Sequence, residues 1–115
     1  MIRAVFKEHK GSIIFQLTGH AGTAEKGKDL VCASASILAY TIAQMALFMH
    51  SEGKLKKKPT VSLKEGNAVV TVKPKEGSDF AEALHTYFVA QVGFSLLAQS
   101  YPQAVEIKML NEKGG

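Results

Sequence analysis

The chain has 115 residues, of which 46 % are hydrophobic and 21 % are charged, and its formal net charge is +4. This balance is that of one globular domain, so it excludes a disordered or fibrous protein, and the length leaves little room for a second domain. The positive charge is too weak to indicate nucleic-acid binding by itself. A single cysteine cannot form an internal disulfide, so we expect a protein of the reducing cytoplasm.

Two β-strands are predicted at the start of the chain. Apolar residues alternate with polar ones along residues 2–9 (IRAVFKEH) and along residues 12–19 (SIIFQLTG). The Lys10-Gly11 pair between them is typical of a hairpin turn. The chain does not begin with an uninterrupted apolar run, so the sequence predicts no signal peptide.

A long helix is predicted over residues 30–51, where apolar residues recur at helical spacing on more than one side. Asp29 is the expected N-cap and Gly53 the expected stop. Its longest apolar stretch, residues 37–49, is interrupted by polar residues and is shorter than a membrane span. We therefore expect this helix to contact two neighbours, and we expect no membrane partner.

The second half of the chain begins with a basic connector at residues 54–58 (KLKKK). Its lysines are most simply a solvated turn, and the alternative is a docking patch for RNA or the ribosome. Residues 60–74 follow as a second predicted hairpin with Gly66-Asn67 at the turn.

A second helix is expected to begin at Asp79, because Glu82 three residues later completes a capping box. It ends before Pro102, and residues 104–110 (AVEIKML) form a last predicted strand. The resulting order is ββαββαβ. We therefore predict a single α+β domain over residues 1–115, a layered fold with two helices packed on a mostly antiparallel sheet.

The residues with the most reactive side chains lie at the two ends of a loop. His20 follows the second predicted strand, and Cys32 lies in the first turn of the first predicted helix. A helix N-terminus has partial positive charge and unpaired N–H groups, which favour a thiolate and can hold an acyl oxyanion. An imidazole can take the thiol proton and later give it to a leaving amine. The pattern is that of a cysteine nucleophile with a histidine base.

Two polar residues near Cys32 have two interpretations each. Asp29 either caps the helix or orients His20. Ser36 lies one helical turn after Cys32 and on the same face. Its hydroxyl either forms a hydrogen bond near the sulfur or belongs to a small residue that permits close packing.

The loop between the histidine and the cysteine contains Gly22 and Gly27, so it is expected to close over a substrate as a lid. Phosphate binding at the helix end is an alternative, but the loop matches neither a P-loop nor GxGxxG. The chain contains no CxxC or HExxH motif. We therefore predict no metal and no cofactor.

Other roles for the lone cysteine remain open at this point. A single cysteine in a helix is more often a small core residue than a nucleophile. A redox-sensing thiol at a helix end is a third interpretation, which is weakened because the chain holds no resolving cysteine.

Taken together, these residues resemble the ribosomal-processing cysteine proteases called Prp. The pieces that match the family pattern are Gly19-His20-Ala21, Gly27, Asp29, Val31-Cys32-Ala33 and Ser36. The order of elements also agrees over nearly the whole chain.

The resemblance implies a cysteine endopeptidase that removes a short N-terminal extension from bacterial large-subunit ribosomal protein twenty-seven, a step required for ribosome assembly or function. It implies that Cys32 is the nucleophile and His20 the general base, with Asp29 and Ser36 at the other polar positions of the family. It also implies a cytoplasmic homodimer. The family's substrate extension ends in apolar and aromatic residues, which implies an apolar groove beside Cys32.

The main rival hypothesis is a non-enzymatic ribosome- or RNA-associated module that uses the basic connector and a sheet surface. No aromatic-rich strand of the kind that stacks RNA bases is present, whereas the Cys/His/Asp/Ser set is. We therefore expect a ribosomal protein as the substrate and no direct nucleic-acid partner.

Overall fold

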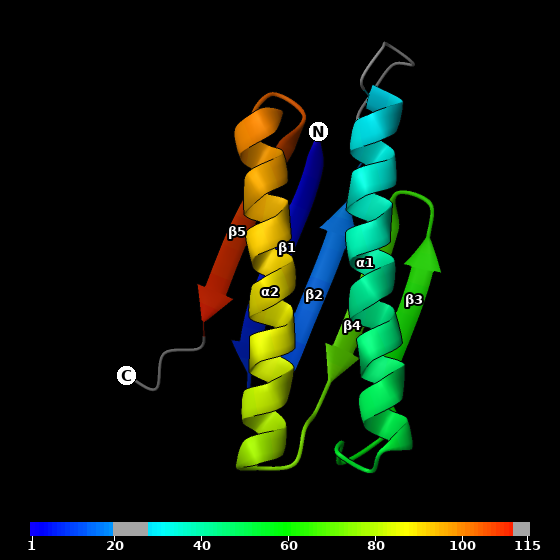
Figure 1. Ribbon diagram of the computed structural model, residues 1–115, viewed down its shortest axis with the longest axis vertical. Helices are drawn as coiled ribbons and strands as arrows, with labels where there is room; N and C mark the ends of the chain where they lie inside the picture. The colour runs from blue at the N-terminus through cyan, green and yellow to red at the C-terminus, as the bar shows by residue number, and fades with distance from the viewer. Residues whose placement is uncertain (20–27, 112–115) are drawn as a thin grey trace.

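The computed structural model describes residues 1–19 and 28–111, and of Lys28, Asp29 and Asn111 it gives the backbone alone. Within this part the elements follow in the predicted order ββαββαβ (Figure 1). Their bounds are β1 (Ile2–His9), β2 (Ser12–Thr18), α1 (Lys28–Ser51), β3 (Thr60–Lys64), β4 (Asn67–Val72), α2 (Ser78–Ser100) and β5 (Val105–Asn111).

The described strands form one sheet in the order β3-β4-β2-β1-β5. Neighbouring strands are antiparallel, except that β5 pairs parallel with β1. The register places Phe6 opposite Phe15, and Phe15 opposite Val70. Because side chains alternate between the two faces of a strand, these large apolar groups share one face. The mostly antiparallel sheet predicted from the sequence is confirmed.

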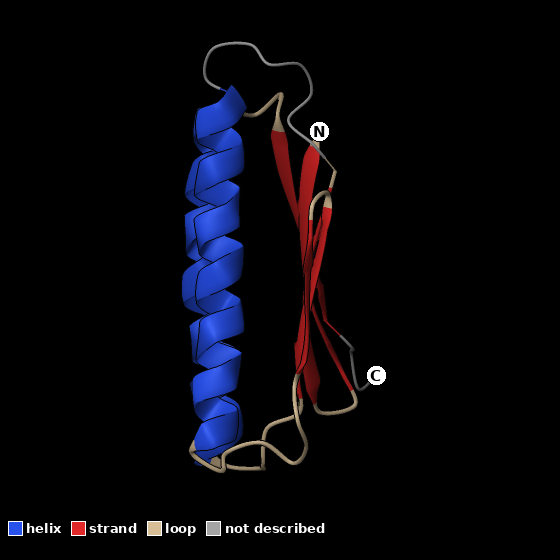
Figure 2. Ribbon diagram, turned by 90° about the vertical axis from the view of Figure 1, so that its right-hand side faces the viewer, coloured by secondary structure: helices blue, strands red, loops and turns tan. Residues whose placement is uncertain are grey.

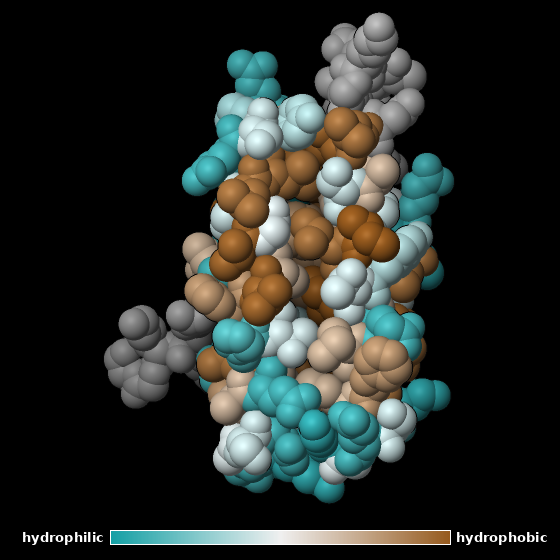
Figure 3. Space-filling view, in the orientation of Figure 1, coloured by the Kyte–Doolittle hydropathy of each residue, from teal (hydrophilic) through white to brown (hydrophobic). Residues whose placement is uncertain are grey.

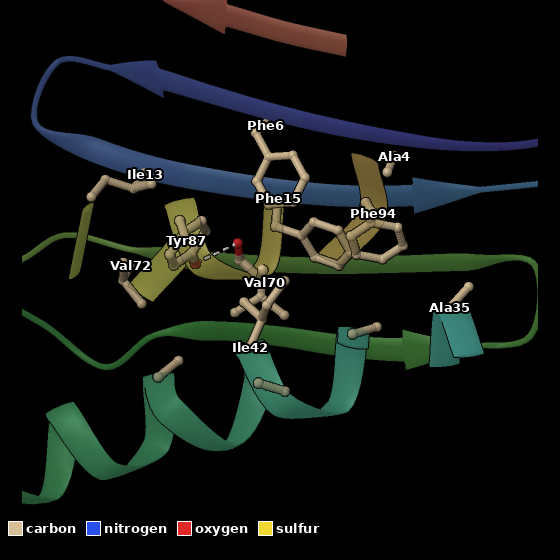
Figure 4. Close-up of a cluster of buried hydrophobic side chains, with 14 of the residues drawn as sticks. Ala4, Phe6, Ile13, Phe15, Ala35, Ile42, Val70, Val72, Tyr87 and Phe94 are labelled. Carbon is tan, nitrogen blue, oxygen red and sulfur yellow. Dashed lines mark hydrogen bonds between the residues drawn. The ribbon is translucent and has the colours of Figure 1, made fainter. Parts of the chain in front are cut away.

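Both helices pack on that same face of the sheet, and Figure 2 shows the resulting two layers edge-on. The core between the layers is rich in aromatic rings (Figure 4). The ring of Phe6 lies 5.1 Å from that of Phe15 and 6.0 Å from that of Phe94. Ile42 of α1 is 1 % exposed and joins this cluster from the other helix. Burying each such side chain contributes about 1.5–3 kcal/mol, so the core fixes both helices on the sheet.

Two tertiary contacts set the position of α2. The buried hydroxyl of Tyr87 donates a hydrogen bond of 3.0 Å to the carbonyl oxygen of Val70 on β4. Gly93 faces α1, where a Cβ atom would lie 2.8 Å from Cδ2 of Leu38. The absence of a side chain at Gly93 therefore lets the two helices approach each other closely.

The start of each helix differs from the sequence prediction. α1 begins at Lys28, so Asp29 lies inside its first turn and is not the N-cap. An acidic residue is favourable at either position because the helix N-terminus is positive, which is why the sequence pattern placed the start too late. α2 is capped by Gly77 with φ of 85° and has no side-chain capping bond, so the predicted capping box is wrong. The Glu82 carboxylate instead accepts a hydrogen bond of 2.8 Å from Nζ of Lys54.

The turn of the second hairpin is also shifted by one residue. Glu65 and Gly66 form the turn, and Asn67 is the first residue of β4 rather than a turn residue. Gly66 adopts φ of 77°, a value that glycine reaches without steric cost.

α1 is longer and more apolar than the sequence argument assumed. By length and composition, the 22 residues from Leu30 to Ser51 are long and apolar enough to cross a membrane, so the argument that the segment is too short is wrong. The core helix of a soluble protein passes the same test. Val31, Ile42 and Met49 are nearly fully buried against the sheet and α2, but only 33 % of the apolar window is buried, so core packing accounts for part of this apolar character.

Candidate active site

Cys32 is the fifth residue of α1, and its side chain is exposed. The first four N–H groups of a helix have no partner within it, and they give that end partial positive charge. The sulfur therefore lies one turn inside a helix end that favours an anion. Its exposure excludes the interpretation of Cys32 as a small buried core residue.

A cavity of about 320 Å³ opens beside Cys32. It lies between the N-terminal half of α1, the end of β2 and the turn that joins β3 to β4. Most of its wall is apolar and comes from Ile2, Leu17, Ala35, Ala39, Leu63 and Ala68. This matches the apolar groove that the family resemblance implies.

The polar part of the same wall contains Ser36, Tyr40 and Asn67. Ser36 was predicted to share a face with Cys32, and both residues line the cavity. Sequence reasoning missed Tyr40 and Asn67 as wall residues. Tyr40 continues the i, i+4 series from Cys32 and could have been found by helical spacing. Asn67 is brought there by its pairing with Thr18 at the end of β2, which no local pattern reveals.

Gly19 is fixed at the mouth of the cavity. Its φ is 95°, and a side-chain carbon at this position would overlap the carbonyl oxygen of Met1. Its N–H donates a hydrogen bond of 3.0 Å to the carbonyl oxygen of Gly66 in the β3–β4 turn. Only glycine fits these constraints, so the backbone leaves the sheet at a defined point one residue before His20.

Several predicted site residues fall outside the described part. His20, Gly22 and Gly27 belong to residues 20–27, and of Asp29 only the backbone is described. The structure thus brings together Cys32 and Ser36 and leaves the roles of the other four as predictions.

Among the residues whose side chains the structure describes, the charged groups that line the cavity are Lys64 and Glu65. Among residues 1–19 and 28–111, no group of three or more His, Cys, Asp or Glu residues is placed to hold a metal ion. The described part of the wall thus contributes the thiol of Cys32, the hydroxyls of Ser36 and Tyr40 and the amide of Asn67.

A larger cavity of about 490 Å³ lies between α2, β1 and β5. Its wall includes Phe6, Leu84, Phe88 and Met109, and the imidazole of His85 also lines it. Cys32 does not line it, and no other thiol exists in the chain. The smaller cavity is therefore the candidate active site.

The basic connector is partly neutralised by acidic neighbours. Nζ of Lys54 lies 2.8 Å from Glu82 and 3.2 Å from Glu52, and Lys56 forms an ion pair with Glu76. These hydrogen bonds raise the pKa of Lys54 and lower the pKa of Glu76. Two lysines of the connector are thus engaged in ion pairs, so the connector is not a uniform basic patch.

Comparison with known proteins tests the resemblance noted from the sequence. The family model of the cysteine protease Prp matches residues 1–106. No curated protein matches the chain.

Solved structures share the fold over nearly the whole chain. SMU.848 from Streptococcus mutans is 23 % identical with a TM-score of 0.66, covering 97 % of this chain and 96 % of that one. The ribosomal processing protease Prp from S. aureus, in complex with a substrate peptide, is 16 % identical with a TM-score of 0.68, covering 95 % of this chain and 99 % of that one. The same protease with a covalently linked product peptide is 18 % identical with a TM-score of 0.66, at the same coverage.

The family match spans most of the chain, and the fold agrees with that of solved members. The resemblance is therefore confirmed, and the rival hypothesis of a non-enzymatic module is not supported. The chain belongs to the Prp family and is a cysteine protease.

Proposed function

We propose that this protease removes the N-terminal extension of bacterial large-subunit ribosomal protein twenty-seven, in the cytoplasm, by a cysteine–histidine mechanism required for ribosome assembly or function. The observation that carries the proposal is the exposed thiol of Cys32, at the start of α1 and at the wall of an apolar cavity, in a chain of the Prp family. The apolar wall suits an extension that ends in apolar and aromatic residues.

The mechanism assigns one role to each group. The thiolate of Cys32 attacks the scissile carbonyl carbon, and the oxyanion that forms is held by N–H groups at the start of α1. His20 takes the thiol proton and gives it to the departing amine, which leaves a thioester on Cys32. Water, deprotonated by the same imidazole, then hydrolyses the thioester and restores the thiol. Support for His20 as the base is that Gly19, the residue before it, lines the Cys32 cavity.

Asp29 and Ser36 are proposed as supporting residues. The backbone of Asp29 lies in the first turn of α1, near enough in sequence to Cys32 to influence the same helix end. Ser36 lines the cavity one turn further along. We also propose that the loop containing Gly22 and Gly27 closes over the bound substrate as a lid.

The homodimer is proposed from the surface that the two helices present to solvent. We define the outer helix face by the large apolar side chains that α1 and α2 leave exposed, which are Leu30, Ile37, Tyr40, Leu47, Phe48, Leu84, Phe88, Val89, Val92 and Leu96. Figure 3 shows apolar residues gathered over both helices. Residues 30–49 and 83–100 contain no Asp, Glu, Lys or Arg. Large uncharged patches of this kind mark protein interfaces.

The size of the outer helix face suits a dimer. Ten large side chains, each about half exposed, supply on the order of several hundred Å² of apolar surface. A standard interface needs about 800 Å² from each partner. A two-fold arrangement would place this face against the same face of a second copy.

Processing of the intact substrate tests the proposed function. Purified protein is incubated with ribosomal protein twenty-seven carrying its extension, and the product masses are measured. We expect the wild type to release the extension and the Cys32→Ser variant to leave the substrate intact. Ser51→Ala, which changes an exposed hydroxyl at the far end of α1, is the matched control and should cleave like the wild type. An intact substrate after incubation with the wild type would overturn the proposal.

A further inference from the structure

The edge strand β3 adjoins the Cys32 cavity. β3 pairs with β4 on one side, and within the described residues no strand pairs with it on the other. In Figure 1 it lies at the sheet edge next to α1. Leu63, near its end, is 41 % exposed and also lines the cavity that holds Cys32. An open strand edge thus leads directly to the candidate active site.

The register shows which backbone groups of β3 are free. The N–H of Gly19 donates a hydrogen bond to the carbonyl oxygen of Gly66. This bond extends the β2–β4 ladder by one pair beyond Thr18 and Asn67. In an antiparallel ladder, hydrogen-bonded and non-hydrogen-bonded pairs alternate. Asn67 therefore directs its N–H and C=O toward β3 and not toward β2.

The same alternation continues along β3. Asn67 is opposite Lys64, and the next bonded pair in this ladder is Ser62 with Val69. The intervening residues Val61 and Leu63 consequently direct their N–H and C=O groups away from β4, toward the open edge. Two donors and two acceptors are thus presented at the spacing of an extended polypeptide.

The side chains at this edge are apolar and face the helices. Val61 is opposite the buried Val70, and Leu63 is opposite the buried Ala68, so both lie on the helix-covered face. A chain added alongside them would direct every second side chain to that face, where the apolar cavity wall begins. The opposite edge, β5, is separated from β3 by three strands and does not line this cavity.

We propose that β3 is the docking edge for the substrate, whose extended segment pairs with Val61 and Leu63 as an additional strand and passes the β3–β4 turn to reach Cys32. Alternating N–H and C=O groups are complementary to a polypeptide backbone, which is how strand addition gives affinity, and pockets for alternate side chains give selectivity. The occupant is thus a peptide with apolar side chains at alternate positions. This inference rests on the proposed proteolytic function of the same site.

A proline at position 61 tests the edge from the side of the enzyme. Val61→Pro removes one outward N–H, a position where a strand tolerates proline. We expect KM for an extended substrate peptide to rise by about five- to tenfold, the value of one hydrogen bond, with kcat within about twofold. Ser62→Ala, at a residue whose N–H and C=O face β4, keeps both outward N–H groups and should resemble the wild type. Alkylation of Cys32 by a small reagent should proceed at the wild-type rate in both variants, which shows that the site is intact.

Substrate peptides with a single N-methyl group test the edge without altering the protein. Binding to the Cys32→Ser variant should weaken at every second peptide position, because only alternate N–H groups face β3. Equal weakening at all positions, or none, would overturn the inference, as would a wild-type KM for Val61→Pro. A Val61→Pro variant that becomes monomeric with unchanged KM would assign the edge to a second copy and also overturn it. Alternating binding without cleavage by the wild type would overturn the proposed function and leave the docking edge standing.

Discussion

The N–H of Gly19 donates a hydrogen bond of 3.0 Å to the carbonyl oxygen of Gly66. This bond joins the end of β2, one residue before His20, to the β3–β4 turn, and both glycines line the cavity that Cys32 adjoins. The point at which the chain leaves the sheet toward the proposed base is therefore set by backbone geometry.

Replacement of Gly19 by alanine should damage both stability and catalysis. Alanine would have to adopt φ near 95°, and its Cβ would overlap the Met1 carbonyl oxygen, so the strand end has to move. We expect the free energy of unfolding to fall by about 1–3 kcal/mol and cleavage to fall with it. Urea unfolding and peptide cleavage measure the two effects. Gly53→Ala is the control, because Gly53 has φ of 72° with open space around it and lies at the far end of α1. Equal behaviour of the two variants would contradict this account of Gly19.

Asp29→Asn separates the two roles of this carboxylate. Since the backbone of Asp29 lies inside the first turn of α1, a negative charge at this position is expected to favour the helix, and asparagine should lose only that modest contribution. If Asp29 orients His20, turnover should fall while the melting temperature changes little. Cleavage rates and thermal unfolding of the variant distinguish these outcomes, and turnover equal to the wild type would exclude the orienting role.

A charge on the outer helix face should dissociate the proposed dimer. Phe48 is 53 % exposed on α1, and Phe48→Lys would place an ammonium group in an uncharged interface. We expect sedimentation velocity to show a dimer for the wild type and a monomer for this variant at micromolar concentration. Leu110→Lys is the matched control, because Leu110 is 52 % exposed and lies on the other face of the sheet. A monomeric wild type would contradict the proposal.

Tyr87→Phe should destabilise the core by about 1–2 kcal/mol, because the variant leaves the buried carbonyl oxygen of Val70 without its donor. Chemical denaturation measures the loss, and Tyr40→Phe, at an exposed tyrosine, should show almost none. Burial also raises the pKa of the Tyr87 hydroxyl well above its ordinary value. The unfolded chain therefore loses this proton first, so the wild type should lose stability as pH rises above about 10, and Tyr87→Phe should lose less.

Much of the fold could be predicted from the sequence because its signals are local. The alternation along residues 2–9 and the helical spacing after Leu30 gave elements that agree with β1 and α1. The helix starts were placed wrongly because Asp29 and Glu82 suit more than one position. Lys54, which pairs with Glu82, is 28 residues away in the chain and could not enter a local pattern.

The candidate site was predictable in its chemistry but not in its walls. Cys32 and Ser36 lie one turn apart, so helical spacing alone placed them together. Leu63 and Asn67 reach the same cavity through strand order, with β4 beside β2 and β3 at the edge. Strand order depends on long-range packing, which the residue pattern of one chain does not specify.

The measurement that tests the central claim most directly is the mass of the enzyme during turnover. Acid quenching of the wild type with its extended substrate, followed by intact-mass analysis and peptide mapping, detects a thioester intermediate. The account predicts an added mass equal to the released N-terminal fragment less one water, located on Cys32, and no such adduct on Cys32→Ala. Cleavage of the substrate by the Cys32→Ala variant, or an acyl group mapped to another residue, would contradict the assignment of Cys32 as the nucleophile.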